Sequence, residues 1–231
     1  MTLVPLVERL HDFYGPVPPP PHDPFTLFVW EVLAVHSTPQ KRDAAMLALK
    51  RIRVLTPDAM WRAPQKKLED SVSLAGPYIE QRLKALRTGV EMFRRAPDLP
   101  RTIRGPVAAA LRALKGLPQM GEGGAYRMLL FAADHPVMPV DARVSRVARR
   151  LGFGREQKDF ARTARSVREA LARELPPDLE AYRRAFVYLN HHGAATCTAT
   201  DPHCEICPLL QNCQHGQRSH GAAGGSTRRE V

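Results

Sequence analysis

The sequence predicts an all-α fold, and three of its features support that prediction. Apolar residues recur every three or four positions in one segment after another, as they do on one face of a helix. Proline and glycine interrupt these segments at positions that suit helix ends. No segment alternates apolar and polar residues for long enough to indicate a β-strand. We therefore expect helices joined by short turns along the chain.

The N-terminal segments fit this pattern in order. Residues 3–14 place Leu3, Leu6, Val7 and Leu10 on one face, and Gly15 ends the helix. The run PVPPPP at 16–21 cannot be helical, because proline lacks a backbone donor and restricts its predecessor, so it is expected to form a stiff connector. A mostly apolar helix should follow through FTLFVWEVLAVHS. Its composition suggests burial on most sides.

Proline continues to divide the chain between residues 23 and 95. Asp23-Pro24 has the form of an N-cap followed by proline at the first helical position. From residue 40 onward the pattern is helical in pieces, separated at Thr56-Pro57, Ala63-Pro64 and Gly76-Pro77.

Residues 105–115 and 124–133 predict two helices joined by the segment LPQMGEG. Two helices with a tight glycine-containing turn form a helix-hairpin-helix. Glycine lets the backbone approach a phosphate closely, with amide groups and the next helix N-terminus directed at the anion. The alternative interpretation is an ordinary corner between two helices without a ligand.

The charge is concentrated in one segment. The net charge is +11, and residues 142–173 hold ten Arg or Lys against three Asp or Glu. Such a field attracts polyanions, of which nucleic acid is the commonest. Arginines recur there at helical spacing, so the segment is interpreted either as a phosphate-facing stripe or as a solvated face: Arg143, Arg146, Arg150, Arg162, Arg165 and Arg168.

All four cysteines lie between residues 197 and 213, in the pattern C-x6-C-x2-C-x5-C. A single compact loop with four thiolates suits a [4Fe-4S] cluster held by Cys197, Cys204, Cys207 and Cys213. Structural zinc, with His203 or His215 as possible ligands, is the alternative, followed by disulfides or free thiols.

The hairpin, a downstream aspartate and this cysteine loop, in that order, resemble the endonuclease III family of helix-hairpin-helix DNA glycosylases. The resemblance runs from about Asp23 to Cys213. It implies two lobes with a DNA cleft between them: a six-helix lobe with the hairpin at 22–134, and a cluster-bearing lobe at 1–21 and 135–215. It also implies that the cluster orders a basic loop against DNA. Residues 216–231 have almost no large apolar side chains and are expected to be a disordered tail.

The resemblance implies a catalytic role for one aspartate. The family's catalytic aspartate lies in a V-D-T-H context, and the matching residues here are Val140-Asp141-Ala142-Arg143. An ionised carboxylate stabilises positive charge developing on the sugar of a flipped nucleotide and can orient a water. From the residues alone Asp141 also reads as a helix N-cap, and the two roles are compatible.

The hairpin departs from the family pattern at its nucleophile. Where bifunctional members read approximately L-P-G-V-G-R-K-T-A, residues 117–125 read LPQMGEGGA, so that Gly123 takes the place of the lysine. Without that amine no Schiff base forms there, which argues against strand cleavage by β-elimination. Lys115 is expected to contact phosphate rather than to replace the amine. Gln119 and Glu122 are expected to weaken the grip on DNA.

Taken together, these features predict a base-excision repair glycosylase with weak or no lyase activity, acting on double-stranded DNA that carries a damaged base. An oxidised pyrimidine is the expected base, and mismatched adenine is disfavoured. The rival interpretations are a catalytically weak protein that binds damaged or abasic DNA and an iron-sulfur electron carrier. A monomer in the cytoplasm, associated with the nucleoid through DNA and without a membrane segment, is expected. The resemblance implies DNA-wedging residues near His36 and Pro77, with His36 as the better candidate and helix capping as its alternative role. The other residues expected to contact DNA are Lys115, Leu117, Gln119, Gly121, Gly123 and Arg143.

Overall fold

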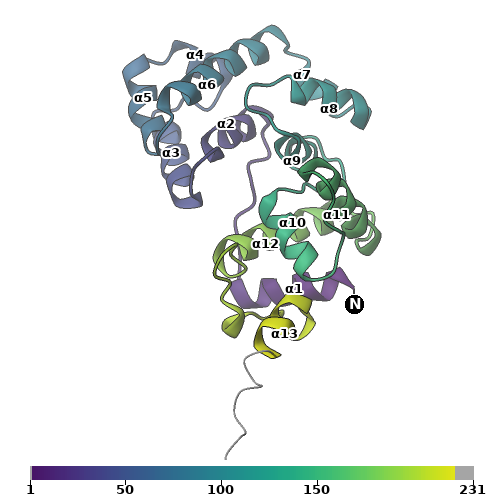
Figure 1. Cartoon of the computed structure of the whole chain (residues 1–231). Coiled ribbons are helices and arrows are strands. Elements are labelled where there is room, and N and C mark those ends of the chain that lie inside the picture. The colour runs from purple at the N-terminus through teal and green to yellow at the C-terminus, as the bar shows by residue number, and fades with distance from the viewer. Residues whose placement is uncertain (1, 222–231) are drawn as a thin grey trace, which may run out of the picture. The chain divides into compact units, whose positions relative to one another are not determined.

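The structure is a computed structural model that describes residues 2–221. Every regular element within this range is helical, which confirms the predicted all-α class (Figure 1). The chain divides into two compact units. We call Pro20–His135 the hairpin unit, and Met1–Pro19 together with Pro136–Val231 the cysteine unit.

The hairpin unit contains six helices of nine or more residues and two short ones. In chain order they are α2 Pro24–Ala34, α3 Pro39–Arg51, α4 Pro57–Arg62, α5 Gln65–Ser73, α6 Ile79–Arg95, α7 Leu99–Thr102, α8 Val107–Lys115 and α9 Glu122–Ala132. Proline starts several of them, as the sequence predicts, because its fixed φ suits the first turn and its missing N–H is not needed there. Asp23 caps α2 by accepting the Thr26 N–H at 2.8 Å.

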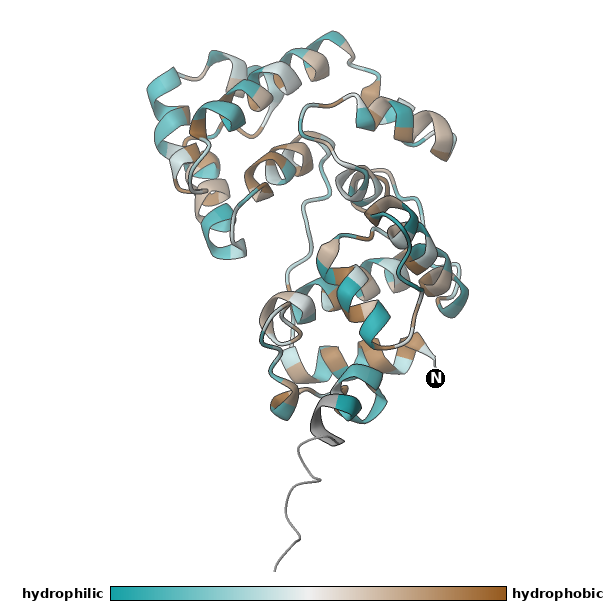
Figure 2. Cartoon of the chain, in the orientation of Figure 1, coloured by the Kyte–Doolittle hydropathy of each residue, from teal (hydrophilic) through white to brown (hydrophobic). Residues whose placement is uncertain are grey.

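Helix α2 is the centre of the hairpin unit's core. It packs against α3, α6 and α9, and its apolar composition is visible as a mostly brown ribbon in Figure 2. Gly89 of α6 allows the closest approach, because a Cβ at that position would lie 2.1 Å from the Phe28 ring. Of the two hairpin helices, α9 packs against α2, and α8 packs against α9.

The cysteine unit is built from α1 Leu3–Tyr14, α10 Ala142–Arg150, α11 Phe160–Glu174 and α12 Leu179–Ala195, followed by two 3-10 turns, Cys204–Ile206 and Leu210–Asn212, and by α13 Gln214–Gly221. Helix α12 packs against both α1 and α10. Leu3, Leu6, Val7 and Leu10 bury the predicted face of α1. No helix within residues 2–221 is long and apolar enough to cross a membrane.

The C-terminal segment differs from the disordered tail expected from residue 216. Gln214–Gly221 forms α13, while residues 222–231 lie outside the described range. Gly216 explains the order of its first turn, since it is buried and donates its N–H to Cys213 Sγ at 3.4 Å. Glycine has no apolar side chain, so the composition of this segment suggested disorder. At position 216, however, the missing side chain allows the backbone to pack closely against Leu210 and Cys213 of the cysteine loop.

Candidate functional site

The turn between α8 and α9, residues 116–121, places its left-handed backbone at Gln119 rather than at a glycine. Gln119 has a φ of 58°, whereas Gly121 has a φ of −71° and Gly123 lies in the first turn of α9. A side chain in this conformation costs on the order of 1 kcal/mol relative to glycine. The Gln119 amide donates to Gln81 O at 3.4 Å, which links the turn to the start of α6. Leu117 is 3% exposed, so its side chain belongs to the core.

The two charged side chains of the hairpin pair with each other. Lys115 Nζ, at the end of α8, lies 3.5 Å from Glu122 Oε2, at the start of α9. Glu122 also lies where a helix dipole favours negative charge. The carboxylate therefore offsets the positive charge that Lys115 would offer to a phosphate.

A buried ion pair, which the sequence analysis missed, anchors α9 to α2. Arg127 Nε lies 2.5 Å from Glu31 Oε1, and a second guanidinium nitrogen lies 2.8 Å from Oε2. The two side chains are only 10% and 8% exposed. A Cβ at Gly124 would lie 2.9 Å from Glu31 Oε2, so the pair fits only beside a glycine. The one signal for it was a lone carboxylate in the otherwise apolar helix 24–34.

Two loops of the hairpin unit present an aromatic pair. His36 follows α2 and Tyr78 precedes α6; both have left-handed backbones, with φ of 50° and 70°, and their ring centroids are 5.3 Å apart. Tyr78 is 52% exposed. Arg82, which is 1% exposed, fixes both loops by donating hydrogen bonds to the carbonyls of Val35, Gly76 and Pro77. His36 and Pro77 were expected from the sequence, whereas Tyr78 and Arg82 were not.

Asp141 in the cysteine unit caps α10, as predicted. Its Oδ1 accepts the backbone N–H groups of Arg143 and Val144, each at 3.0 Å. Its Oδ2 accepts from Asn190 Nδ2 of α12 at 2.6 Å. Donors from two helices thus orient the carboxylate. Asn190 was also missed, because nothing local in the sequence relates it to a residue 49 positions away.

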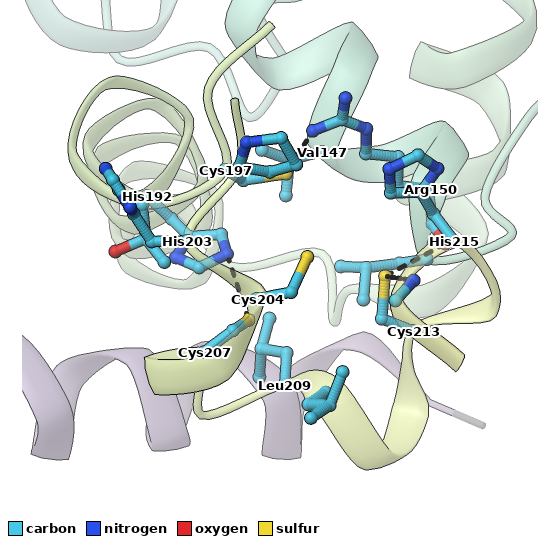
Figure 3. A pocket seen from close by; sticks show the side chains of 15 residues that line it. Val147, Arg150, His192, Cys197, His203, Cys204, Cys207, Leu209, Cys213 and His215 are labelled. Carbon is cyan, nitrogen blue, oxygen red and sulfur yellow. Dashed lines mark hydrogen bonds between the residues drawn. The ribbon is translucent and has the colours of Figure 1, made fainter. Parts of the chain in front are cut away.

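The four cysteines line one hollow, which Figure 3 shows with the side chains around it. Burial raises the pKa of the Cys207 thiol to about 11 and also raises the pKa of Cys204, so positive charge from a bound metal would be needed to hold both as thiolates at neutral pH. Within residues 2–221, no three His, Cys, Asp or Glu side chains converge as the ligands of a single metal ion would. A set of four thiols around a shared apolar hollow fits an iron-sulfur cluster.

Polar groups of the cysteine unit are directed at these sulfurs. Burial lowers the pKa of His192 to about 4, so its ring is neutral at pH 7. Its Nδ1 lies 2.7 Å from the Tyr14 hydroxyl, and its Nε2 lies 3.7 Å from Cys207 Sγ. The tautomer in which Nδ1 accepts from Tyr14 places the ring proton on Nε2, where it can donate to the sulfur. Arg150 donates to Cys197 Sγ at 3.1 Å.

The arginines of α10 differ from both sequence interpretations, since two of them bind the cysteine loop. Arg146 donates to the carbonyls of Gly193 and Cys197, and Arg150 donates to those of Thr198 and Ala199. Their positive charge holds the loop because its carbonyls lack helical partners. The expectation of a basic loop was wrong as well: residues 198–203 read TATDPH and contain no Lys or Arg.

Comparisons with known proteins agree with this architecture. No protein-family model matches the chain. Endonuclease III of Thermotoga maritima is 29% identical over 208 residues, which cover 90% of this chain and 91% of the relative. Thymine/uracil-DNA glycosylase of Pyrobaculum aerophilum is 26% identical over 176 residues, or 73% and 76% of the two chains. A solved non-covalent endonuclease III–DNA complex matches with a TM-score of 0.74 at 22% identity, covering 96% of this chain and 99% of that one. The chain is therefore similar in sequence to endonuclease III, and it has the fold of the helix-hairpin-helix DNA glycosylases.

Proposed function

We propose that this protein is a monofunctional DNA glycosylase of base excision repair, which removes a damaged base and leaves the strand uncut. The observation that carries the proposal is the carboxylate of Asp141, oriented by three donors, in a chain whose hairpin has Gly123 in place of an amine. The similarity to endonuclease III and to a thymine/uracil-DNA glycosylase supports the class of reaction.

The reaction that suits Asp141 is hydrolysis of the N-glycosidic bond. As the bond between the base and C1′ breaks, the bonding electrons leave with the base and positive charge develops on the sugar. An ionised carboxylate beside the sugar stabilises that charge. The oxygen of a water molecule then bonds to C1′ and the water loses a proton, while the departing base takes up a proton. No covalent enzyme intermediate is needed in this sequence.

Strand cleavage by β-elimination is not expected, because it requires an amine that attacks C1′. Gly123 has no side chain, and Lys115 is held 3.5 Å from the carboxylate of Glu122. Lys115 also precedes the turn instead of taking the position of Gly123.

We assign DNA contacts to two regions of the hairpin unit and one of the cysteine unit. The His36 and Tyr78 rings, next to Pro77, offer an apolar surface that can stack on bases or fill the space left by a flipped one. Backbone N–H groups at the start of α9 suit a phosphate. The residues assigned to backbone contact are Lys115, Leu117 through its main chain, Gln119, Gly121, Gly123 and Arg143.

The cofactor that the four cysteines would hold is a [4Fe-4S] cluster, with Cys197, Cys204, Cys207 and Cys213 as ligands. When bound, it supplies charge and cross-linking to the loop rather than a step of hydrolysis. Arg146 and Arg150 join this loop to α10, the helix that Asp141 caps. The substrate we assign is a duplex with an oxidised pyrimidine, bound by one copy of the chain.

The test is incubation with duplexes that each carry one lesion, with half of every sample then treated with hot alkali. Strand breaks that appear only after alkali are expected for at least one oxidised pyrimidine. Breaks without alkali, together with a borohydride-trapped protein–DNA product, would contradict monofunctional action. Asp141→Asn is the matched control, because asparagine retains the helix cap while removing the charge.

A second candidate function is binding of damaged or abasic DNA without efficient chemistry. It is favoured by the hairpin, where Gln119 occupies a glycine conformation and Glu122 adds a negative charge. Retained affinity for an abasic duplex, with no base release from any lesion, would support this alternative. Preferential binding to undamaged duplex would argue against both functions.

A further inference from the structure

Asn190 joins two helices of the cysteine unit at Asp141. Its Nδ2 lies 2.6 Å from Asp141 Oδ2, whereas Oδ1 accepts the backbone N–H groups of α10. A carboxylate accepts hydrogen bonds only, so the nitrogen of the amide, not its oxygen, must be directed at it. The two oxygens of Asp141 are thus held from two different helices, α10 and α12.

The helix packing that allows this bond depends on Gly193. A Cβ at Gly193 would lie 2.8 Å from Arg143 Cβ and 3.2 Å from Arg143 O, so α12 could not approach the first turn of α10 as closely with any other residue. Asn190 precedes Gly193 by three residues and therefore shares its face of α12. The contact between Asn190 and Asp141 is a consequence of this packing rather than of two surface side chains meeting.

We propose that Asn190 is a positioning residue for Asp141, which fixes the plane of the carboxylate. The inference rests on the proposed role of Asp141 in base release. A neutral amide donor orients the carboxylate without adding a positive charge of its own, as a lysine or arginine partner would. A carboxylate that must stabilise positive charge on a sugar needs both properties.

The charged groups near this bond have hydrogen-bond partners of their own. The Arg146 guanidinium attracts the Asp141 carboxylate electrostatically but donates to the carbonyls of Gly193 and Cys197, and Arg168 Nε donates to Met138 O. Burial lowers the pKa of both histidines that follow Asn190, so they are neutral at pH 7. The charged side chains and histidines of the two joined helices that lie nearest to the bonded pair in sequence are Arg143 and Arg146 of α10 and His191 and His192 of α12.

The test compares three variants of the full chain. Asn190→Leu keeps the size of the side chain and removes the donor. Asn190→Asp keeps the shape but donates only when protonated. Tyr188→Phe is the matched control, because it removes another hydrogen bond of α12, to Gly15 O at 3.0 Å, without touching Asp141. Each variant is measured by the ¹³C NMR chemical shift of the Asp141 carboxyl carbon, with the signal assigned through Asp141→Asn, and by single-turnover base release across pH.

Loss of the donor in Asn190→Leu should change the ¹³C chemical shift of the Asp141 carboxyl carbon and slow base release about tenfold or more at neutral pH. Tyr188→Phe should leave both unchanged. For Asn190→Asp, the rate relative to wild type should rise as the pH falls from about 8 to 5, because protonation of the new side chain restores a donor.

An Asp141 carboxyl chemical shift that is equal in wild type and Asn190→Leu would overturn the proposal whatever the activity, as would a rate ratio for Asn190→Asp that does not change with pH. Failure of the proposed function gives a different result. In that case Asp141→Asn would release the base at the wild-type rate, while the carboxyl chemical shift would still show whether Asn190 acts on the carboxylate.

Discussion

Replacing Arg127 with methionine tests the buried ion pair that fixes the second hairpin helix. Arg127 and Glu31 pair through two contacts of 2.5 and 2.8 Å, with side chains 10% and 8% exposed. Arg127→Met leaves the Glu31 carboxylate buried without its partner, which should lower the free energy of unfolding by about 3 to 5 kcal/mol. The double variant Glu31→Leu with Arg127→Met removes both charges and should cost far less, because neither charge is then left unpaired.

Tryptophan fluorescence during urea unfolding measures this effect in the correct part of the chain. The chain has two tryptophans, Trp30 and Trp61, and both belong to the hairpin unit. Arg94→Met is a matched control, since Arg94 stacks on Trp61 at 4.8 Å and pairs with Asp58 at 2.9 Å, but at the surface. That variant should change the free energy of unfolding by about 0 to 1 kcal/mol.

Two results would refute this account of the buried pair. One is a cost below about 1 kcal/mol for Arg127→Met, which would mean that water or other groups compensate the Glu31 charge. The other is additivity, in which the double variant loses the sum of the two single losses and the coupling between the residues is near zero.

Three further changes give expected outcomes. Gln119→Gly should stabilise the hairpin unit by about 1 kcal/mol, because glycine adopts a φ of 58° without strain. Urea unfolding measures this change in the free energy of unfolding, and a loss of stability would contradict the assigned turn. Glu122→Gln should tighten duplex binding and steepen its dependence on salt, as measured by fluorescence anisotropy, whereas unchanged affinity would remove Lys115 from the phosphate contacts. His192→Phe should lower the reduction potential of the protein reconstituted with its proposed iron-sulfur cluster, because the change removes the hydrogen-bond donor beside Cys207. Voltammetry measures the potential, and an unchanged value would exclude that hydrogen bond.

Features of the sequence that act locally predicted the helices and their caps. Asp23-Pro24 and Asp141 precede helices, and a capping side chain bonds N–H groups only two or three residues ahead, so the pattern is readable without the fold. The hairpin and the cysteine spacing are local for the same reason.

Contacts between distant segments could not be predicted in this way. Glu31 and Arg127 are 96 residues apart, and Asp141 and Asn190 are 49 apart. The sequence around one residue of such a pair does not indicate the other residue, because each contact depends on how two helices pack. The arginines of α10 show the same limit: spacing placed them on a helix, while their binding to the carbonyls of the cysteine loop follows from the position of that loop.

Single-turnover base release by Asp141→Asn tests the central claim most directly. Asparagine keeps the cap of α10, so the variant should fold and bind a lesion duplex with unchanged affinity. Because the charge that stabilises the sugar is gone, the rate of base release should fall about a hundredfold or more. Base release at the wild-type rate, with folding and affinity preserved, would contradict the assignment of the chemistry to Asp141.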